Sequence, residues 1–270
     1  MKNLFDITDR VVVITGGLGV LGINISQYLV SQGAIVVVLA RSVEKGEKFV
    51  GEMENAGGKA AFFASDVLDR DSLVSARDKI VAKYGKIDVL INAAGGNMAE
   101  ANIAPTQNVF DLSMDALHKV VDLNLFGTIL PTQIFMESMV ENGKGVILNF
   151  SSMSAFRPLT RVCGYGMAKT AINSFTEFMA GELALKFGEN FRINAVAPGF
   201  FLTEQNRTLL TNPDGSHTER AKDIIKHTPF RRFGVANELN GTVHYLISDA
   251  SGFVTGTVAV VDGGFNSFTV

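Results

Sequence analysis

The chain has 270 residues, of which 47% are hydrophobic, and its formal net charge is -3 at pH 7. This length allows one large α/β core, and the near-neutral charge argues against a nucleic-acid partner, which usually needs a basic face. The single cysteine, Cys163, excludes an intrachain disulfide. No run approaches the roughly eighteen apolar residues of a membrane span, and the first residues show no apolar signal region. We therefore expect a cytoplasmic protein without a membrane partner.

Apolar, β-branched runs alternate with longer amphipathic segments along the chain. Runs this continuous in valine and isoleucine are typical of strands buried on both faces, and hence of a parallel sheet. Their alternation with helices predicts an α/β fold with a doubly wound, Rossmann-like sheet, in one domain over residues 1–270. The predicted strands are 11–15, 35–40, 60–64, 89–92, 146–150, 193–197 and 258–261, and the predicted helices are 20–32, 43–56, 70–84, 113–141, 164–187 and 236–248.

The longest irregular segment is 198–235, between the sixth predicted strand and the last predicted helix. A loop of that length inside a compact domain is usually functional. We expect it to form a substrate lid.

A glycine-rich turn follows the first predicted strand. Gly17, Gly19 and Gly22 match GxGxxG, with a strand before the turn and a helix after it. Such glycines permit a tight turn and let the backbone approach a pyrophosphate at a helix N-terminus, although an ordinary strand–helix corner is the alternative. The predicted nucleotide contacts in this turn are Gly16, Gly17, Gly19, Val20, Leu21 and Gly22.

The second predicted strand ends at Ala40, followed by Arg41 and Ser42. NAD-binding proteins typically place a carboxylate here for the ribose 2′-hydroxyl, and Ala40 offers none. Arg41 could instead meet a 2′-phosphate, which favours NADP(H) as cofactor and leaves NAD(H) as the second choice. The alternative is that Arg41 is a solvated charge and that Ser42 only caps a helix.

The next two predicted strands also end in residues that suit a nucleotide. Asp66 and Val67 follow the third strand, where the adenine would lie. The fourth strand ends in the small residues of Asn92, Ala93, Ala94 and Gly95, which would allow close approach of a cofactor, or would simply make a tight turn.

Asn124 stands inside a predicted helix, where asparagine is mildly unfavourable, which hints at a role beyond helix formation. The alternative is a buried hydrogen bond between helices.

Ser152, Tyr165 and Lys169 carry groups suited to proton transfer. Tyr165 and Lys169 are four residues apart and share one face of a predicted helix. A free phenol has a pKa of about 10, and a lysine ammonium one turn away would lower it. Ser152 follows a predicted strand and could hydrogen-bond a substrate oxygen. The trio suits carbonyl reduction or alcohol oxidation, although a Tyr-x-x-x-Lys pair also occurs by chance as a solvated pair.

In their order and spacing, these motifs resemble those of the short-chain dehydrogenase/reductases over essentially the full length of the chain. The resemblance is carried by TGGLGVLG (15–22), NAAG (92–95), Asn124, Ser152, Tyr165 with Lys169, PGFFLT (198–203) and VTGTVAVVDGG (254–264). One departure is that short members usually read TGxxxGxG, with glycine where this chain has Val20, whereas this chain reads TGxxGxxG.

The resemblance implies a role for each matching residue. Tyr165 would be the general acid and base, and Lys169 would lower its pKa and hold the nicotinamide ribose. Ser152 would orient the substrate oxygen, and Asn124 would anchor a water of a proton relay. The segment after the sixth strand would meet the nicotinamide through Pro198, Gly199, Phe201 and Thr203. Paired helices and a homotetramer are common in that family, so we expect a homotetramer here, and no metal.

A narrower likeness is carried by AAGGN, DLNLFGTILPTQ and APGFFLTEQNRTLL, which look like the D-mannonate oxidoreductase (fructuronate reductase) subgroup, with gluconate 5-dehydrogenases nearby. It implies a sugar acid as substrate and a cation for its carboxylate. Arg207 is the first candidate and Arg157 the second, with Arg161 also near the pocket, and surface charge is the alternative for each. Asn97 is a further substrate candidate.

Two other functions stay open. A 3-oxoacyl thioester reductase would use an apolar channel, which Phe156, Phe200 and Phe201 could line. A nucleotide-sensing module without chemistry would not need Ser152 and Tyr165, whose presence argues against it.

Overall fold

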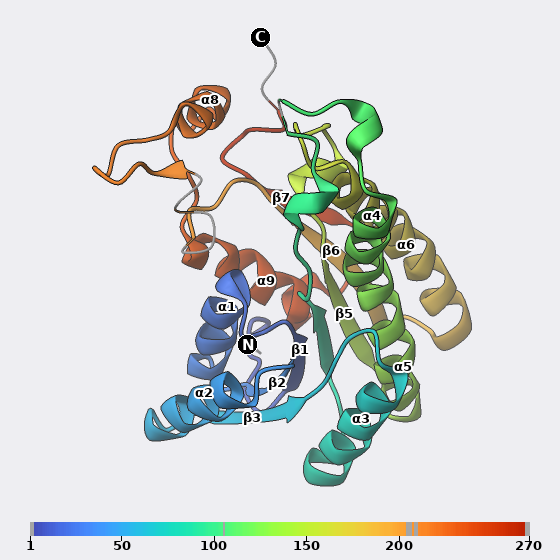
Figure 1. Cartoon of the computed structure of the whole chain (residues 1–270). Coiled ribbons are helices and arrows are strands. Elements are labelled where there is room, and N and C mark those ends of the chain that lie inside the picture. The colour runs from blue at the N-terminus through green and yellow to red at the C-terminus, as the bar shows by residue number, and fades with distance from the viewer. Residues whose placement is uncertain (1–2, 105, 204–206, 208–209, 268–270) are drawn as a thin grey trace.

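The computed structural model describes residues 3–104, 106–203, 207 and 210–267. A seven-stranded sheet runs through it in the order β3-β2-β1-β4-β5-β6-β7, and every neighbouring pair is parallel (Figure 1). The strands are β1 (Val11–Thr15), β2 (Ile35–Ala40), β3 (Lys59–Ala64), β4 (Val89–Asn92), β5 (Gly145–Phe150), β6 (Phe191–Pro198) and β7 (Val258–Val261).

Helices connect the strands and cover both faces of the sheet. They are α1 (Val20–Ser31), α2 (Val43–Asn55), α3 (Arg70–Tyr84), α4 (Met114–Val121), α5 (Gly127–Glu141), α6 (Cys163–Phe187), α8 (Glu219–His227) and α9 (Asn240–Ile247). A π-helical turn, η3 (Asp122–Phe126), joins α4 to α5, and the short 3-10 helices are η1 (Ala99–Ala101), η2 (Val109–Asp111), η4 (Met153–Ala155), η5 (Ala236–Leu239) and η6 (Asp249–Ser251).

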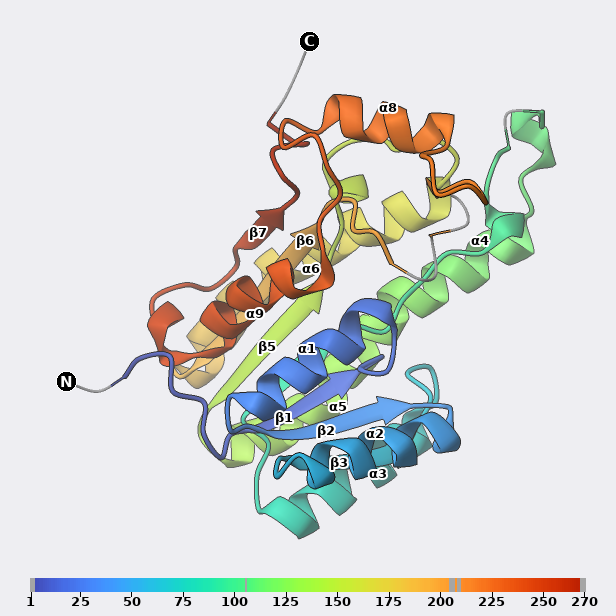
Figure 2. The same cartoon turned by 90° about the vertical axis from the view of Figure 1, so that its left-hand side faces the viewer.

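The core has two layers, one on each face of the sheet. Ile25 of α1, Phe49 of α2 and Leu246 of α9 are buried in one layer, and Ile80 of α3 and Phe135 of α5 are buried in the other, which α6 also covers (Figure 2). Alternate residues of each strand enter opposite layers, because successive side chains on a strand point to opposite faces. The doubly wound, Rossmann-like fold is thereby confirmed.

The observed boundaries lie within two residues of the predicted strand limits. β3, β5 and β6 begin one or two residues earlier because Lys59, Gly145 and Phe191 pair with the neighbouring strand. The predicted 113–141 helix is instead α4, η3 and α5 in succession, and the predicted 236–248 helix is η5 followed by α9. The irregular 198–235 segment contains α8, which lies beyond the carboxyl ends of the strands (Figures 1 and 2). No helix in the described ranges has the length and apolarity to cross a membrane.

Candidate functional site

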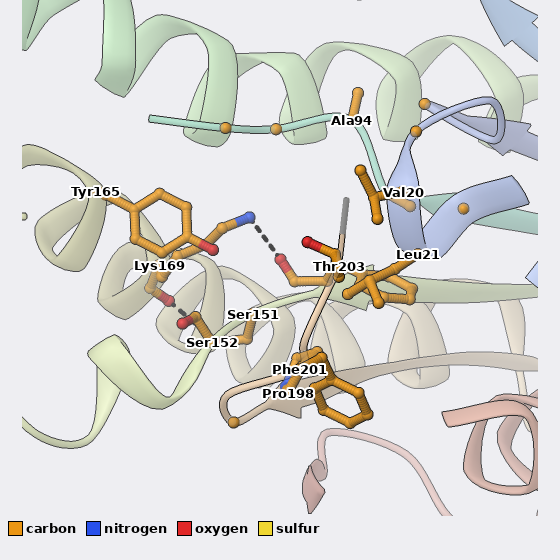
Figure 3. A pocket seen from close by; sticks show the side chains of 18 of the residues that line it. Val20, Leu21, Ala94, Ser151, Ser152, Tyr165, Lys169, Pro198, Phe201 and Thr203 are labelled. Carbon is orange, nitrogen blue, oxygen red and sulfur yellow. Dashed lines mark hydrogen bonds between the residues drawn. The ribbon is translucent and has the colours of Figure 1, made fainter. Parts of the chain in front are cut away.

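Two adjoining cavities lie along the carboxyl ends of the central strands. The first, of about 390 Å³, and the second, of about 510 Å³, share Gly16, Gly19, Ala94 and Gly95. The predicted residues that line the first are Gly16, Gly19, Val20, Leu21, Gly22, Ala93, Ala94, Gly95, Ser152, Tyr165, Lys169, Pro198, Gly199, Phe201 and Thr203 (Figure 3). Those that line the second are Gly16, Gly19, Arg41, Ser42, Asp66, Val67, Ala94 and Gly95.

The glycine turn after β1 has no room for side chains. Gly16 has a φ of +66°, and a Cβ there would lie 2.7 Å from the Ala94 backbone. A Cβ on Gly22 would lie 2.3 Å from the Gly16 carbonyl oxygen. Gly19 is the N-cap of α1 and offers no side chain to its first backbone N–H groups, so that the positive end of the helix faces the cavity. These residues fit a nucleotide pyrophosphate.

Two predicted contacts do not line either cavity. Gly17 faces the interior, where a Cβ would meet Ser26 and Val38, so it is needed for the packing of the turn. Asn92 is buried, and its side-chain N–H₂ donates to Thr132 and Asn149, both at 2.9 Å. It joins β4 to β5 and α5 from behind the cleft.

The second cavity ends at the residues after β2 and β3. Ser42 accepts a hydrogen bond from the Lys45 backbone N–H at 3.4 Å. It therefore caps α2, which was the alternative interpretation of this residue in the sequence. Arg41 is exposed beside it. Lys119 of α4 also lines this cavity and supplies a second cation that the sequence reasoning did not identify.

The trio of Ser152, Tyr165 and Lys169 meets at the floor of the first cavity (Figure 3). Ser152 follows β5 in an extended conformation and caps η4, accepting from the Ser154 backbone N–H at 3.2 Å. Tyr165 and Lys169 lie one turn apart in the first turns of α6. Lys169 is 3% exposed, and its Nζ donates to the Phe150 carbonyl oxygen at 2.7 Å. The same Nζ lies 5.5 Å from the centroid of the Tyr165 ring.

Burial shifts the pKa of both titrating groups of the trio, Tyr165 and Lys169. It raises the pKa of the Tyr165 phenol, and hydrogen bonding with the Ser152 side chain opposes that rise. Burial also lowers the pKa of Lys169 to about 7. The direction for Tyr165 is opposite to the lowering expected from the sequence. The physical reason is the burial of the phenol itself, because a buried site disfavours the charged phenolate.

Asn124 lies in the π-helical turn η3, and its amide holds the turn after β4. Its Nδ2 donates to the Gly96 and Val120 carbonyl oxygens at 2.7 and 2.8 Å, and its Oδ1 accepts from the Gly96 N–H at 3.2 Å. Both side-chain hydrogens are thus used within the protein. The expected water anchor is therefore limited to Oδ1, and the contacts shown make Asn124 a residue that positions Gly95 and Gly96.

The substrate candidates lie in different places. Asn97 is exposed and donates to the Asn102 side chain at 2.7 Å, outside the cleft lining. Arg157 donates to the Asn266 carbonyl oxygen at 2.6 Å. Arg157 and Arg161 line a third cavity, of about 500 Å³, on the α6 flank. Arg207 is exposed and is described without its immediate neighbours.

Several residues that line the cleft were missed by the sequence reasoning. Phe150 is the last residue of β5, Ser151 lies between it and Ser152, and Gly96 extends the NAAG turn by one position. The signal for the first two was their place at the carboxyl end of a central strand, where open α/β sheets bind ligands. Leu18 and Met98 line the second cavity and carried no such signal.

Comparison with known proteins gives consistent results. The short chain dehydrogenase family model matches residues 10–214. The uncharacterised oxidoreductase UxuB of Bacillus subtilis (strain 168) is 41% identical over 273 residues, with 98% of this chain and 97% of that protein covered.

Solved structures agree over nearly the whole length. A Haemophilus influenzae protein described provisionally as a D-mannonate oxidoreductase, with bound NAD, is 36% identical, with a TM-score of 0.91 and 99% of each chain covered. A gluconate 5-dehydrogenase from Burkholderia cenocepacia J2315, in complex with NADP and tartrate, is 30% identical, with a TM-score of 0.87 and 98% of each chain covered. With the family model, the relatives and the cleft in agreement, this chain belongs to the short-chain dehydrogenase family and is an oxidoreductase that uses a nicotinamide nucleotide.

Proposed function

We propose that the protein interconverts a ketone and a secondary alcohol of a sugar acid, of the D-fructuronate and D-mannonate type, with NADP(H) as the favoured cofactor. The observation that carries this proposal is the meeting of Ser152, Tyr165 and Lys169 at the floor of a cleft whose other end suits a dinucleotide. When bound, the nicotinamide supplies or accepts the hydride. The protein groups then have to hold the substrate oxygen and move one proton.

Each member of the trio has a distinct task in reduction. Ser152 Oγ donates to the substrate carbonyl oxygen and fixes its position. Tyr165 Oη gives its proton to that oxygen as the alcohol forms, and burial suits this role because it keeps the phenol protonated at neutral pH. Lys169, held by the Phe150 carbonyl near the Tyr165 ring, would bind the nicotinamide ribose. Oxidation runs the same steps in reverse.

Nucleotide binding follows the two cavities. The glycine turn and the N-terminus of α1 would hold the pyrophosphate, and Asp66 and Val67 would bind the adenine end. Arg41 would receive the 2′-phosphate of NADP(H), with Ser42 next to it. The nicotinamide end would be bound by the lining residues Pro198, Gly199, Phe201 and Thr203.

A polar substrate is supported by two observations. The similar solved structures include the proteins named for D-mannonate and gluconate, and the latter holds tartrate with NADP. The segment after the nicotinamide contacts, 198–235, reads Glu204, Gln205, Asn206 and Arg207, of which the first three lie outside the described residues. Buried polar groups left unpaired cost about 1–3 kcal/mol each, so these side chains suit hydroxyl groups better than an acyl chain. We propose that this segment is a lid that closes over the substrate.

A 3-oxoacyl thioester reductase is the second candidate, and one observation favours it. Phe201 is buried against the cleft, Phe200 lines it, and Phe200 stacks edge-on against Phe265 with ring centroids 5.1 Å apart. This aromatic wall could contact an acyl chain.

The discriminating experiment follows the loss of reduced nicotinamide absorbance with purified protein. D-Fructuronate and other keto-sugar acids form one panel, and 3-oxoacyl thioesters form the other, each with NADPH and NADH. Turnover of a sugar acid at a higher kcat/KM than any thioester supports the proposal. Turnover confined to thioesters moves the assignment to the second candidate, and nucleotide binding without turnover of either panel indicates a sensor.

A further inference from the structure

We infer that Arg161 and Arg220 form a two-arginine site for the carboxylate of the substrate, an assignment that rests on the proposed sugar-acid function. Arg161 lies in the segment between Ser152 and Tyr165, and Arg220 lies in the first turn of α8, within the proposed lid segment. The site would thus be assembled from the α6 flank of the cleft, where Arg161 lines the third cavity, and from the proposed lid.

Three chain segments converge at this point. Arg220 Nη1 lies 3.4 Å from the Thr160 hydroxyl oxygen, which joins α8 to the segment before α6. The next residue, Arg161, has a φ of +79°, a conformation that is uncommon for a residue with a side chain. Its carbonyl oxygen accepts from the Ile103 N–H at 3.1 Å, which ties it to the segment after β4. The three segments that surround the carboxyl ends of β4, β5 and β6 are therefore connected where the two arginines lie.

Arg220 contacts the residue that precedes Arg161, so the two cationic side chains start from neighbouring points of the fold. Among the described residues, neither forms an ion pair within 4.0 Å. The nearest acidic residue in the sequence of α8, Glu219, is paired with Lys222 at 2.6 Å. Partial burial and the nearby Arg161 charge both lower the pKa of Arg220. Like charges held together in this way are stabilised when an anion lies between them.

The position of the pair suits a substrate whose carboxylate lies several bonds from its reacting carbonyl. Tyr165 follows Arg161 by four residues, so their Cα atoms are at most about 14 Å apart. An arginine side chain and the carbon chain of a hexuronate can span such a separation between them. Arg can also bind a carboxylate through two parallel hydrogen bonds. Arg157 is a weaker candidate because its guanidinium already donates to the Asn266 carbonyl.

The test compares Arg161→Gln and Arg220→Gln with the wild type. Lys226→Gln is the matched control, because Lys226 is an exposed cation on the same helix. We expect each arginine variant to lower kcat/KM for D-fructuronate by about 10- to 150-fold, as for loss of a charge-assisted hydrogen bond, mainly through KM. Activity on an uncharged ketohexose should change less than about threefold, and Lys226→Gln should match the wild type on both substrates.

Equal losses on the charged and uncharged substrates would overturn the carboxylate site and leave the proposed function standing. The site would also be overturned if Arg207→Gln selectively lost activity on D-fructuronate and Arg220→Gln did not. If the wild type reduces no sugar acid, the proposed function fails separately. Equilibrium binding of D-gluconate, measured by calorimetry, then tests the pair without turnover. Binding by the wild type that weakens at least about tenfold in Arg161→Gln/Arg220→Gln supports the site, and equal or absent binding overturns it.

Discussion

The Lys169 ammonium nitrogen lies 5.5 Å from the centroid of the Tyr165 ring and donates to the Phe150 carbonyl oxygen at 2.7 Å. Lys169 is held in this place by α6 and is almost completely buried. A buried ammonium costs free energy unless it is compensated, and this cost is the origin of its lowered pKa. The stability of the protein should therefore depend on the charge of Lys169.

The first prediction follows from this pKa. Folding lowers the pKa of Lys169 from 10.5 to about 7. Between these values the unfolded chain binds a proton that the folded chain does not, so the Lys169 contribution to stability rises with pH. The cost of its burial is complete below about pH 7 and is relieved as the pH rises toward 10.5.

The difference in free energy of unfolding between wild type and Lys169→Met should shift in favour of wild type by about 2–3 kcal/mol from pH 6 to pH 9. Urea denaturation at several pH values measures it, and parallel pH profiles for the two proteins would contradict the prediction.

The second prediction concerns the cofactor. If Arg41 binds the 2′-phosphate, Arg41→Ala should weaken NADPH binding by about 10- to 150-fold, or about 1.5–3 kcal/mol, and leave NADH nearly unchanged. Arg70→Ala is a suitable control, because Arg70 is an exposed arginine at the start of α3 and does not line the cleft. Fluorescence titration with each nucleotide gives the affinities. A wild-type protein that prefers NADH would refute the assignment.

The third prediction concerns assembly. Met167, Phe178 and Leu185 are 49%, 65% and 86% exposed, and their spacing places them along one face of α6. An exposed apolar stripe of this kind often marks an interface, and we propose that it contributes to a homotetramer. Light scattering at micromolar concentration should give the tetramer mass, and Phe178→Asp should reduce it, whereas Val43→Asp on the distant α2 should not. A monomer mass for the wild type would exclude the tetramer.

The strands were predictable because hydrophobic patterning is a local property. β1, β2, β4 and β7 have their predicted limits, since each is a short apolar run bounded by turn residues. The glycine turn was predictable for the same reason, because its function needs small residues at fixed spacing. The nucleotide contacts near it follow from the strand order, which the alternation of strands and helices indicates.

Other features depend on contacts that a single sequence does not display. The π-helical turn at Asn124 forms where the amide bonds to Gly96, a residue of another loop. The raised pKa of Tyr165 depends on how deeply the phenol is buried, and the i, i+4 spacing gives no measure of burial. Arg220 went unnoticed because α8 brings it to Thr160 only in the folded chain, whereas Arg157 and Arg161 were noticed for their closeness in sequence to Ser152.

The role of Tyr165 as proton donor is tested most directly by comparing the reduction of D-fructuronate by wild type and by Tyr165→Phe, with nucleotide affinity measured for both. Only the proton donor is lost in this variant, so we predict that its kcat falls below a tenth of the wild-type value while the Kd for NADPH stays nearly unchanged. A variant that keeps a tenth or more of the wild-type kcat would contradict the assignment of Tyr165 as the proton donor.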